Sequence, residues 1–253
     1  MRPEAIPPVR LVGAGPGPAD LLTLRAVRAI EGAEALLYDA LVGEEVLALA
    51  PQACLKIQTG KRAGRASMKQ ETINRLMARL ARRGLRVVRL KGGDPSVFGR
   101  VGEEQAALRA QGIDCEIVPG VTAACAAAAQ FGAPLTHRGL ARRVVFTTAT
   151  LQDGRIAMDW AAASDPEATL AIYMGSRAAP EIARRLIASG RAPATPLAIV
   201  SNAGRTDARL ARSTLAETAA GAAPDTGGGP ALILVGDVLA LAAAAAAPLV
   251  GAA

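Results

Sequence analysis

The sequence predicts an α/β protein with two domains. Apolar runs of strand length alternate with helical patterns, and glycine-rich loops follow two of the runs. The alternation breaks near Gly132-Ala133-Pro134 and then resumes. A chain of 253 residues is long enough for two modest α/β domains. We therefore predict an N-terminal domain over residues 1–133 and a C-terminal domain over residues 134–253, with parallel or mixed sheets covered by helices.

In the first domain, most apolar runs are followed by a helical stripe. Val9 to Val12 is typical of a buried strand, and a stripe of apolar residues at helical spacing begins at Leu21. Gly84 and Gly112 stand where helices are expected to end, because glycine readily adopts the left-handed conformation found there. The predicted strands are 9–12, 35–38, 54–58, 86–90 and 115–118, and the predicted helices are 21–31, 69–83, 101–111 and 121–131.

The second domain carries five further apolar runs. A glycine- and proline-rich stretch from Pro224 to Pro230 predicts a flexible turn before the last of them. The alanine-rich tail over 238–253 is too short to span a membrane and predicts a packed helix. The predicted strands are 143–148, 169–174, 196–201, 207–213 and 231–236.

Two loops are the candidate ligand-binding segments. Gly92-Gly93-Asp94-Pro95 ends a strand, and adjacent glycines let a backbone pass close to a ligand. Gly13 to Pro18 joins the first strand to the first helix, but it is not a dinucleotide fingerprint, because Pro18 stands where the third glycine belongs. Prolines 16 and 18 also remove backbone donors that a pyrophosphate would need. The loop therefore suits a less charged ligand.

The charge of the chain favours an anionic partner. The net charge is +7 and the isoelectric point is near 10.0. A basic surface is typical of nucleic-acid binding, but aromatic residues are only 2% of the chain, so few rings are available to stack on bases. A small polycarboxylate substrate explains the charge equally well. We expect no nucleic-acid partner.

Cysteine and histidine usage excludes several chemistries. Cys54, Cys115 and Cys125 have no metal-ligand spacing, and their odd number argues against a disulfide framework. His137 is the only histidine, which argues against a histidine-based metal cluster and against a Ser-His triad. No metal is expected. The N-terminus has no signal-peptide pattern, so we expect a cytoplasmic protein without a membrane partner.

An ordered set of motifs from about Val9 to about Val238 resembles the uroporphyrinogen-III C-methyltransferases of the tetrapyrrole methylase superfamily. One such block is weak support, but the complete set in the family's order is specific. The blocks are Val12 to Gly17 with Leu21 to Leu24, Tyr38 to Val42, Gly60 to Gly64, Leu90 to Pro95, Phe98 to Arg100, Gly102 to Glu104, Val118 to Ala123 and Pro134 to Arg138, with weaker matches at Tyr173 to Gly175 and Leu232 to Gly236.

The resemblance implies a two-domain tetrapyrrole methylase architecture, with S-adenosyl-L-methionine bound in the inter-domain cleft, and a homodimer. The implied reaction is methylation of uroporphyrinogen III at carbons 2 and 7, giving precorrin-2 via precorrin-1 and releasing S-adenosyl-L-homocysteine. Three alternatives remain open: a sister methylase acting on a later corrin precursor, a non-catalytic tetrapyrrole-binding paralogue and a ribosomal RNA methylase. The Phe98-Gly99-Arg100 block disfavours the last.

The resemblance also implies the residues that bind the donor. Asp94 has an acceptor for the ribose or amino-acid part, and Thr122 and Ala123 open a helix whose free backbone donors face a ligand. Taken alone, Thr122 is also a helix cap, Met174 a core residue and Ala203 a turn residue. By motif match the donor-binding residues are Pro16, Gly92, Gly93, Asp94, Val97, Thr122, Ala123, Met174 and Ala203.

The family pattern assigns Asp39 as proton acceptor and Lys61 as proton donor. Asp39 follows an apolar strand, where partial withdrawal from water suits a base, although such an acid is ordinarily a helix cap or a turn residue. For the substrate carboxylates we predict Arg100, Glu103 and Arg138, because arginine binds carboxylates in bidentate geometry. Arg100 and Glu103 also have the spacing of an intrahelical ion pair.

Three positions depart from the family pattern. Thr148-Ala149-Thr150 stands where a Thr-Gly-His motif is usual, and Ser96 and Val101 replace a usual aromatic residue and a usual glycine. These departures bear on substrate range and rate rather than on donor binding.

Overall fold

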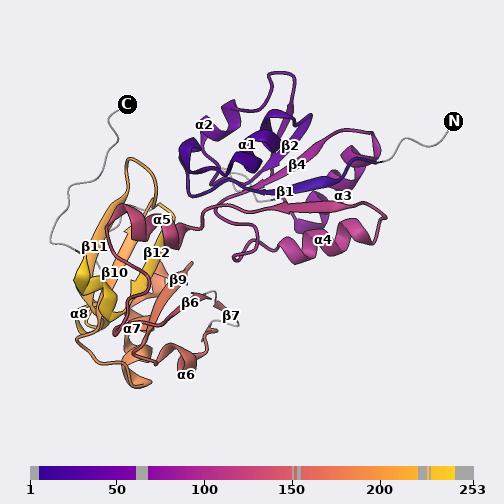
Figure 1. Ribbon diagram of the computed structural model, residues 1–253. Coiled ribbons are helices and arrows are strands. Elements are labelled where there is room, and N and C mark those ends of the chain that lie inside the picture. The colour runs from indigo at the N-terminus through magenta and orange to yellow at the C-terminus, as the bar shows by residue number, and fades with distance from the viewer. Residues whose placement is uncertain are drawn as a thin grey trace. The chain divides into compact units, whose positions relative to one another are not determined.

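The computed structural model describes residues 6–60, 68–149, 151–152, 155–221, 227 and 229–242. It divides into two compact units, Met1–Thr122 and Ala123–Ala253 (Figure 1). The division falls before the helix α5 (Ala123–Gln130), whereas the sequence placed the domain boundary at residue 133. The boundary at 133 remains a prediction.

The first unit is built on a five-stranded sheet whose neighbouring strands all run parallel. Its order is β3-β2-β4-β1-β5. The chain leaves β1 toward β2 on one side and leaves β4 toward β5 on the other, so the connections diverge between β1 and β4. Ligands bind at such a switch point, outside the carboxyl ends of the strands. The strands are β1 (Val9–Gly13), β2 (Ala35–Tyr38), β3 (Leu55–Gln58), β4 (Val87–Lys91) and β5 (Cys115–Val118).

Helices cover both faces of this sheet. On one face Ile30 and Val46 pack against strand residues such as Leu36. On the other face Met77 and Leu108 pack against strand residues such as Leu37. The predicted helix over 21–31 begins later, at Leu24, because the Thr23 side chain accepts from the Ala26 amide and caps the first turn. The helices are η1 (Ala19–Leu21), α1 (Leu24–Glu31), α2 (Glu44–Ala48), α3 (Gln70–Arg82) and α4 (Val101–Arg109).

The second unit has a mixed sheet in the order β11-β10-β12-β9-β6. β6 and β9 are parallel, whereas β12 is antiparallel to both β9 and β10. β9 and β10 therefore end at the same edge of the sheet. The strands are β6 (Arg143–Thr148), β9 (Ala168–Tyr173), β10 (Pro196–Ser201), β11 (Arg209–Thr214) and β12 (Ala231–Val235), beside a short pair, β7 (Leu151–Gln152) and β8 (Arg155–Ile156).

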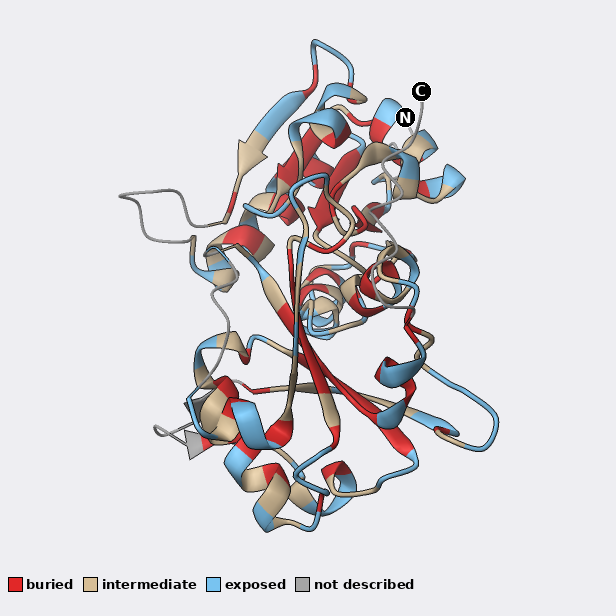
Figure 2. Ribbon diagram, turned by 90° about the vertical axis from the view of Figure 1, so that its left-hand side faces the viewer, coloured by how far each residue is buried: buried red, intermediate tan, exposed pale blue. Residues whose placement is uncertain are grey.

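Small and branched side chains fill the second core. Ile182 and Leu186 pack on one face of the sheet, and Ala124, Ala127 and Leu239 pack on the other, so each face carries its own buried cluster and the strands between them are largely buried (Figure 2). The tail predicted as a helix forms a short 3-10 helix, η3 (Asp237–Leu241), and residues 243–253 lie outside the described residues. The other helices are α6 (Trp160–Ala163), η2 (Ser176–Ala178), α7 (Ala179–Ala188) and α8 (Leu215–Ala219).

The α/β fold class is confirmed, and the ten strands predicted for the two sheets all form, with bounds shifted by one or two residues at most. Gly84 and Gly112 have φ values of 80° and 68°, as expected for glycines that end helices. None of the helices in the described ranges is both long enough and apolar enough to cross a membrane.

Candidate active site

Three glycine-containing loops meet at the carboxyl edge of the first sheet. The loops after β1 and β4 join in a short bridge, in which the Gly93 amide donates to the Gly15 carbonyl at 2.7 Å and the Gly15 amide donates back at 3.2 Å. Gly120, after β5, packs against both loops: a Cβ there would lie 2.4 Å from the Gly93 carbonyl oxygen and 2.9 Å from the Gly13 Cα. The three backbones are therefore in direct contact at the switch point.

Asp94 ties two of these loops together. Its Oδ1 accepts from the Ser96 amide at 2.7 Å, and its Oδ2 accepts from the Gly120 amide at 2.9 Å. A carboxylate oxygen has two lone pairs, so each retains capacity for a ligand donor. Asp94 thus has a structural function in addition to the donor-binding role predicted for it.

The remaining predicted donor residues of this unit lie around the same loops. Gly92 is packed under Leu41, since a Cβ on this glycine would lie 3.3 Å from the Leu41 Cβ. Val97 donates its amide to the Asp94 carbonyl at 3.1 Å. Pro16 follows the bridged Gly15, and Thr122 is buried at the end of the β5 loop. The predicted donor residues of the first unit therefore lie on the loops at one edge of the sheet.

Asp39 follows β2 at this edge and is one-third exposed. Its side chain caps no helix, because the N-cap of α2 is Gly43. Instead it forms an ion pair with Arg89 of β4 and accepts from the Thr59 hydroxyl at 3.3 Å. The ordinary helix-cap role considered for Asp39 is therefore wrong, and an ion pair takes its place.

The partners of Asp39 belong to a buried polar cluster that the sequence reasoning missed. Arg89, Lys91 and Glu104 are at most 4% exposed. Arg89 Nε and Lys91 Nζ donate to Glu104 Oε1 at 3.0 and 3.1 Å. Burial, followed by the charge of Arg89, lowers the pKa of Lys91. The sequence did contain a signal for this cluster. Arg89 and Lys91 are two residues apart in an otherwise apolar strand, so both side chains lie on the same face as Val87.

Arg100 and Glu103 form the ion pair that their spacing permits, although Arg100 is the N-cap of α4 and Glu103 lies in its first turn. Arg100 donates from Nε at 2.8 Å and from Nη2 at 2.6 Å to the two oxygens of Glu103, and both side chains are more than half exposed. The hydrogen bond from Arg100 lowers the pKa of Glu103. Arg100 has a φ of 56°, in the left-handed region that costs energy for a residue with a Cβ.

Non-glycine residues with left-handed backbone lie at or beside the motifs that predict the site. Among the described residues, the four non-glycine positions with positive φ are Phe98, Arg100, Met174 and Asn202. Two are predicted site residues, and Asn202 precedes the predicted Ala203. Strained backbone persists where the surroundings enforce it, which happens most often at ligand sites.

In the second unit, three predicted donor residues lie near one edge of the sheet. Met174 follows β9 and is 60% exposed, so it is not the core residue considered as its ordinary role. Ala123 begins α5, whose next amide, that of Ala124, donates to the Tyr173 hydroxyl at 3.2 Å. Ala203 follows β10 and is 8% exposed within the apolar cluster.

The remaining positions singled out in the sequence are Arg138, Lys61 and Thr150. Arg138 occupies an exposed turn, closed by a bridge between His137 and Ala141, that leads into the amino end of β6. Lys61 and Thr150 lie outside the described residues. Gly60, which precedes Lys61, packs against the residue after Asp39, because a Cβ there would lie 2.3 Å from the Ala40 nitrogen.

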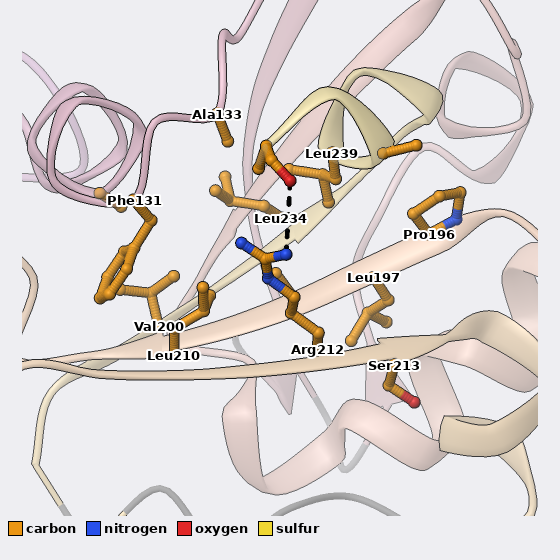
Figure 3. A pocket seen from close by; sticks show the side chains of 14 residues that line it. Phe131, Ala133, Pro196, Leu197, Val200, Leu210, Arg212, Ser213, Leu234 and Leu239 are labelled. Carbon is orange, nitrogen blue, oxygen red and sulfur yellow. Dashed lines mark hydrogen bonds between the residues drawn. The ribbon is translucent and has the colours of Figure 1, made fainter. Parts of the chain in front are cut away.

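A pocket of about 210 Å³ lies within the second unit, and none of the predicted site residues lines it. Figure 3 shows its apolar wall, with the Arg212 side chain reaching into it from β11. Arg212 Nη1 donates to the Ala242 carbonyl at 3.4 Å. Phe131, Leu210 and Leu234 are among the apolar side chains around it.

The described part of the chain contains no cluster of metal-ligand side chains and no disulfide. No three His, Cys, Asp or Glu side chains gather there around a point where an ion could bind. Cys54, Cys115 and Cys125 are free thiols.

A parallel sheet with a glycine-lined switch point, followed by a mixed sheet, defines an α/β protein with a ligand site at strand ends. The family model for Tetrapyrrole (Corrin/Porphyrin) Methylases matches residues 8–219. The chain belongs to this family of methylases.

Solved structures support the same assignment. The uroporphyrin-III C-methyl transferase from Thermus thermophilus, crystallised with S-adenyl homocysteine, is 43% identical and has a TM-score of 0.81, over 92% of this chain and 99% of that one. A cobalt precorrin-4 methyltransferase of cobalamin biosynthesis is 29% identical with a TM-score of 0.79, over 91% of this chain and 95% of that one.

Curated relatives are longer than this chain. The sirohaem synthase of Azotobacter vinelandii is 46% identical over 239 residues, which are 94% of this chain and 52% of the relative. Sirohaem synthase 1 of Yersinia enterocolitica is 48% identical over 233 residues, 91% of this chain and 48% of the relative. The chain thus spans about half the length of these relatives.

Proposed function

We propose that this protein transfers methyl groups from S-adenosyl-L-methionine to carbons 2 and 7 of uroporphyrinogen III, giving precorrin-2 via precorrin-1. The contact of three glycine-containing loops at the switch point is the observation that carries the proposal, because it provides a close-packed backbone cradle at a strand-end ligand site. Membership of the tetrapyrrole methylases and the likeness to the Thermus enzyme support it.

The cradle suits the donor chemically. Gly92 and Gly93 let the backbone approach a ligand, and Asp94 retains acceptor capacity for donor hydroxyl or ammonium groups. In the proposal, Pro16, Val97 and Thr122 complete the donor-binding residues of the first unit, and Ala123, Met174 and Ala203 are those of the second unit. When bound, S-adenosyl-L-methionine supplies an activated methyl group on a sulfonium, and S-adenosyl-L-homocysteine is the product.

The residues around the cradle carry the remaining chemistry. Asp39, one-third exposed at the same edge, accepts the proton that the macrocycle loses after methylation. Lys61 is the proposed proton donor, and it directly follows Gly60, which packs against Ala40. Arg100, Glu103 and Arg138 bind the polar rim of the substrate, where the arginines pair with its carboxylates. The proposal includes a cytoplasmic homodimer that needs no metal, nucleic acid or membrane.

Replacing Arg100 by alanine separates substrate binding from stability. Water screens an ion pair this exposed, so Arg100→Ala should leave the melting temperature nearly unchanged. If Arg100 pairs with a substrate carboxylate, steady-state assays should show KM raised by about tenfold, with S-adenosyl-L-homocysteine affinity retained. Arg184→Ala is the matched control, because Arg184 is equally exposed and pairs with Glu181 at the same helical spacing. A KM equal to that of this control contradicts the role.

An assay of the purified chain tests the proposed function directly. Uroporphyrinogen III and methyl-labelled S-adenosyl-L-methionine are incubated without oxygen, and products are identified by mass and by the position of the label. Two methyl groups, at carbons 2 and 7, are the expected result. Activity only on a later corrin precursor favours the second candidate, a sister methylase. The likeness to the cobalt precorrin-4 methyltransferase supports this candidate. Binding of both ligands without turnover indicates a non-catalytic tetrapyrrole-binding paralogue.

A further inference from the structure

A single buried carboxylate holds together two elements behind the candidate site. Glu104 of α4 has no exposed surface. Its Oε1 accepts three hydrogen bonds, from Arg89 Nε at 3.0 Å, from Lys91 Nζ at 3.1 Å and from Gln70 Nε2 at 3.1 Å. The donors come from β4 and α3, so this carboxylate joins the sheet to both helices that cover this face (Figure 1).

The guanidinium of Arg89 continues the chain of contacts to the candidate base. Its Nη1 donates to the Thr59 hydroxyl and to the Leu90 carbonyl, each at 3.2 Å, and its Nη2 pairs with Asp39. All three of its nitrogens are therefore engaged. The exposed fraction of the side chain rises from 0% at Glu104 to 3% at Arg89 and 33% at Asp39. Only the Asp39 end of this chain reaches the ligand-facing edge.

The cluster is formally neutral, with two cations and two carboxylates. Burying such groups is costly, and apolar side chains of similar volume often give equal or greater stability. A buried ionic cluster is therefore weak support for a purely stabilising role. Its geometry instead fixes the orientation of the Asp39 carboxylate, which is one-third exposed, and a functional carboxylate needs this property from its surroundings.

We propose that Glu104 is a positioning residue that acts through Arg89 on Asp39. By occupying Arg89 Nε, Glu104 fixes the rotamer in which the other end of the guanidinium orients the Asp39 carboxylate. Lys91 balances the charge of Glu104 and does not touch Asp39 by any hydrogen bond found in the described residues. The inference rests on the proposed function of Asp39 as proton acceptor.

A double-mutant cycle tests this inference. Single-turnover methyl transfer to uroporphyrinogen III is measured with saturating ligands for wild type, Glu104→Gln, Asp39→Asn and the double variant. Since base catalysis contributes about 10²–10⁴-fold, Glu104→Gln should lower the rate by about tenfold in the wild-type background. In the Asp39→Asn background it should have no further effect, because coupled residues are non-additive. Calorimetric affinity for S-adenosyl-L-homocysteine should stay unchanged throughout.

Two controls separate positioning from general stability. Glu181→Gln makes the same chemical change in an exposed ion pair of the second unit and should leave every rate unchanged. Lys91→Met removes the other buried cation but leaves the Glu104–Arg89 contact, so its rate should remain within about threefold of wild type. If Glu104→Gln does not fold, the pair Glu104→Met with Lys91→Met replaces it, since an apolar pair can substitute for buried charges. The same non-additivity is then expected.

The outcomes are distinguishable. Equal rate losses from Glu104→Gln in both backgrounds, or a Lys91→Met loss as large as that of Glu104→Gln, overturn the positioning role. A wild-type protein that transfers no methyl group overturns the proposed function and this inference together. An active wild type with an unaffected Glu104→Gln variant overturns this inference alone.

Discussion

Asp39→Asn is expected to lower single-turnover methyl transfer by about 10²-fold or more while leaving both ligands bound. Asparagine keeps the size of the side chain and an acceptor for Thr59 and Arg89, but it cannot take a proton at neutral pH. The measurement is quenched-flow transfer of labelled methyl at saturating ligand, well below the melting temperature of the variant. S-adenosyl-L-homocysteine affinity, measured by calorimetry, should match that of wild type.

The competing role for Asp39 is structural, because it pairs with the nearly buried Arg89. Under that role Asp39→Asn lowers the melting temperature but changes the rate little. Asp20→Asn is a suitable control, since this exposed acid lies in η1 and has no ion pair in the described residues. A rate within about threefold of wild type removes Asp39 from the mechanism.

Gly120→Ala is expected to disrupt the donor site. The added Cβ would lie 2.4 Å from the Gly93 carbonyl oxygen and 2.9 Å from the Gly13 Cα, and backbone atoms cannot rotate away as the end of a side chain can. Overpacking of this kind costs about 1–3 kcal/mol or more of unfolding free energy. Relief requires the loops after β1, β4 and β5 to separate. Calorimetry should therefore show S-adenosyl-L-homocysteine affinity reduced by at least about tenfold, the equivalent of 1.4 kcal/mol.

Gly102→Ala is the matched control for this prediction. A Cβ at Gly102, in α4, meets no atom within 4 Å, and alanine is favoured over glycine in a helix by about 0.5–1 kcal/mol. Its melting temperature should equal or exceed that of wild type, and its donor affinity should be unchanged. Normal donor binding by Gly120→Ala would show that the three loops do not form the donor cradle.

Local patterns in the sequence predicted the elements of both sheets. Strands such as Ala35–Tyr38 and Leu232 to Val235 are continuous apolar runs, and burial on both faces of a sheet requires such runs. Glycines 84 and 112 marked helix ends because the left-handed conformation is cheap only for glycine. The short helices α2, α6 and α8 were not predicted, since four or five residues carry too little periodicity to identify. The ten-residue helix α7 was missed as well, although Ala179, Ile182, Ala183 and Leu186 form an apolar stripe at helical spacing.

The sequence by itself determined the fold class, the two glycine-rich loops and, through the ordered family motifs, the residues expected to bind the donor. Tertiary structure decided the partners of those residues. Asp39 meets Arg89, and Arg89 meets Glu104, only because parallel pairing places β2 beside β4 and because α4 packs on the same face. Sequence patterns report local periodicity, whereas ion pairs between residues 15 and 50 positions apart depend on strand order and helix packing. Only the folded chain could therefore reveal the charged cluster behind the proposed base.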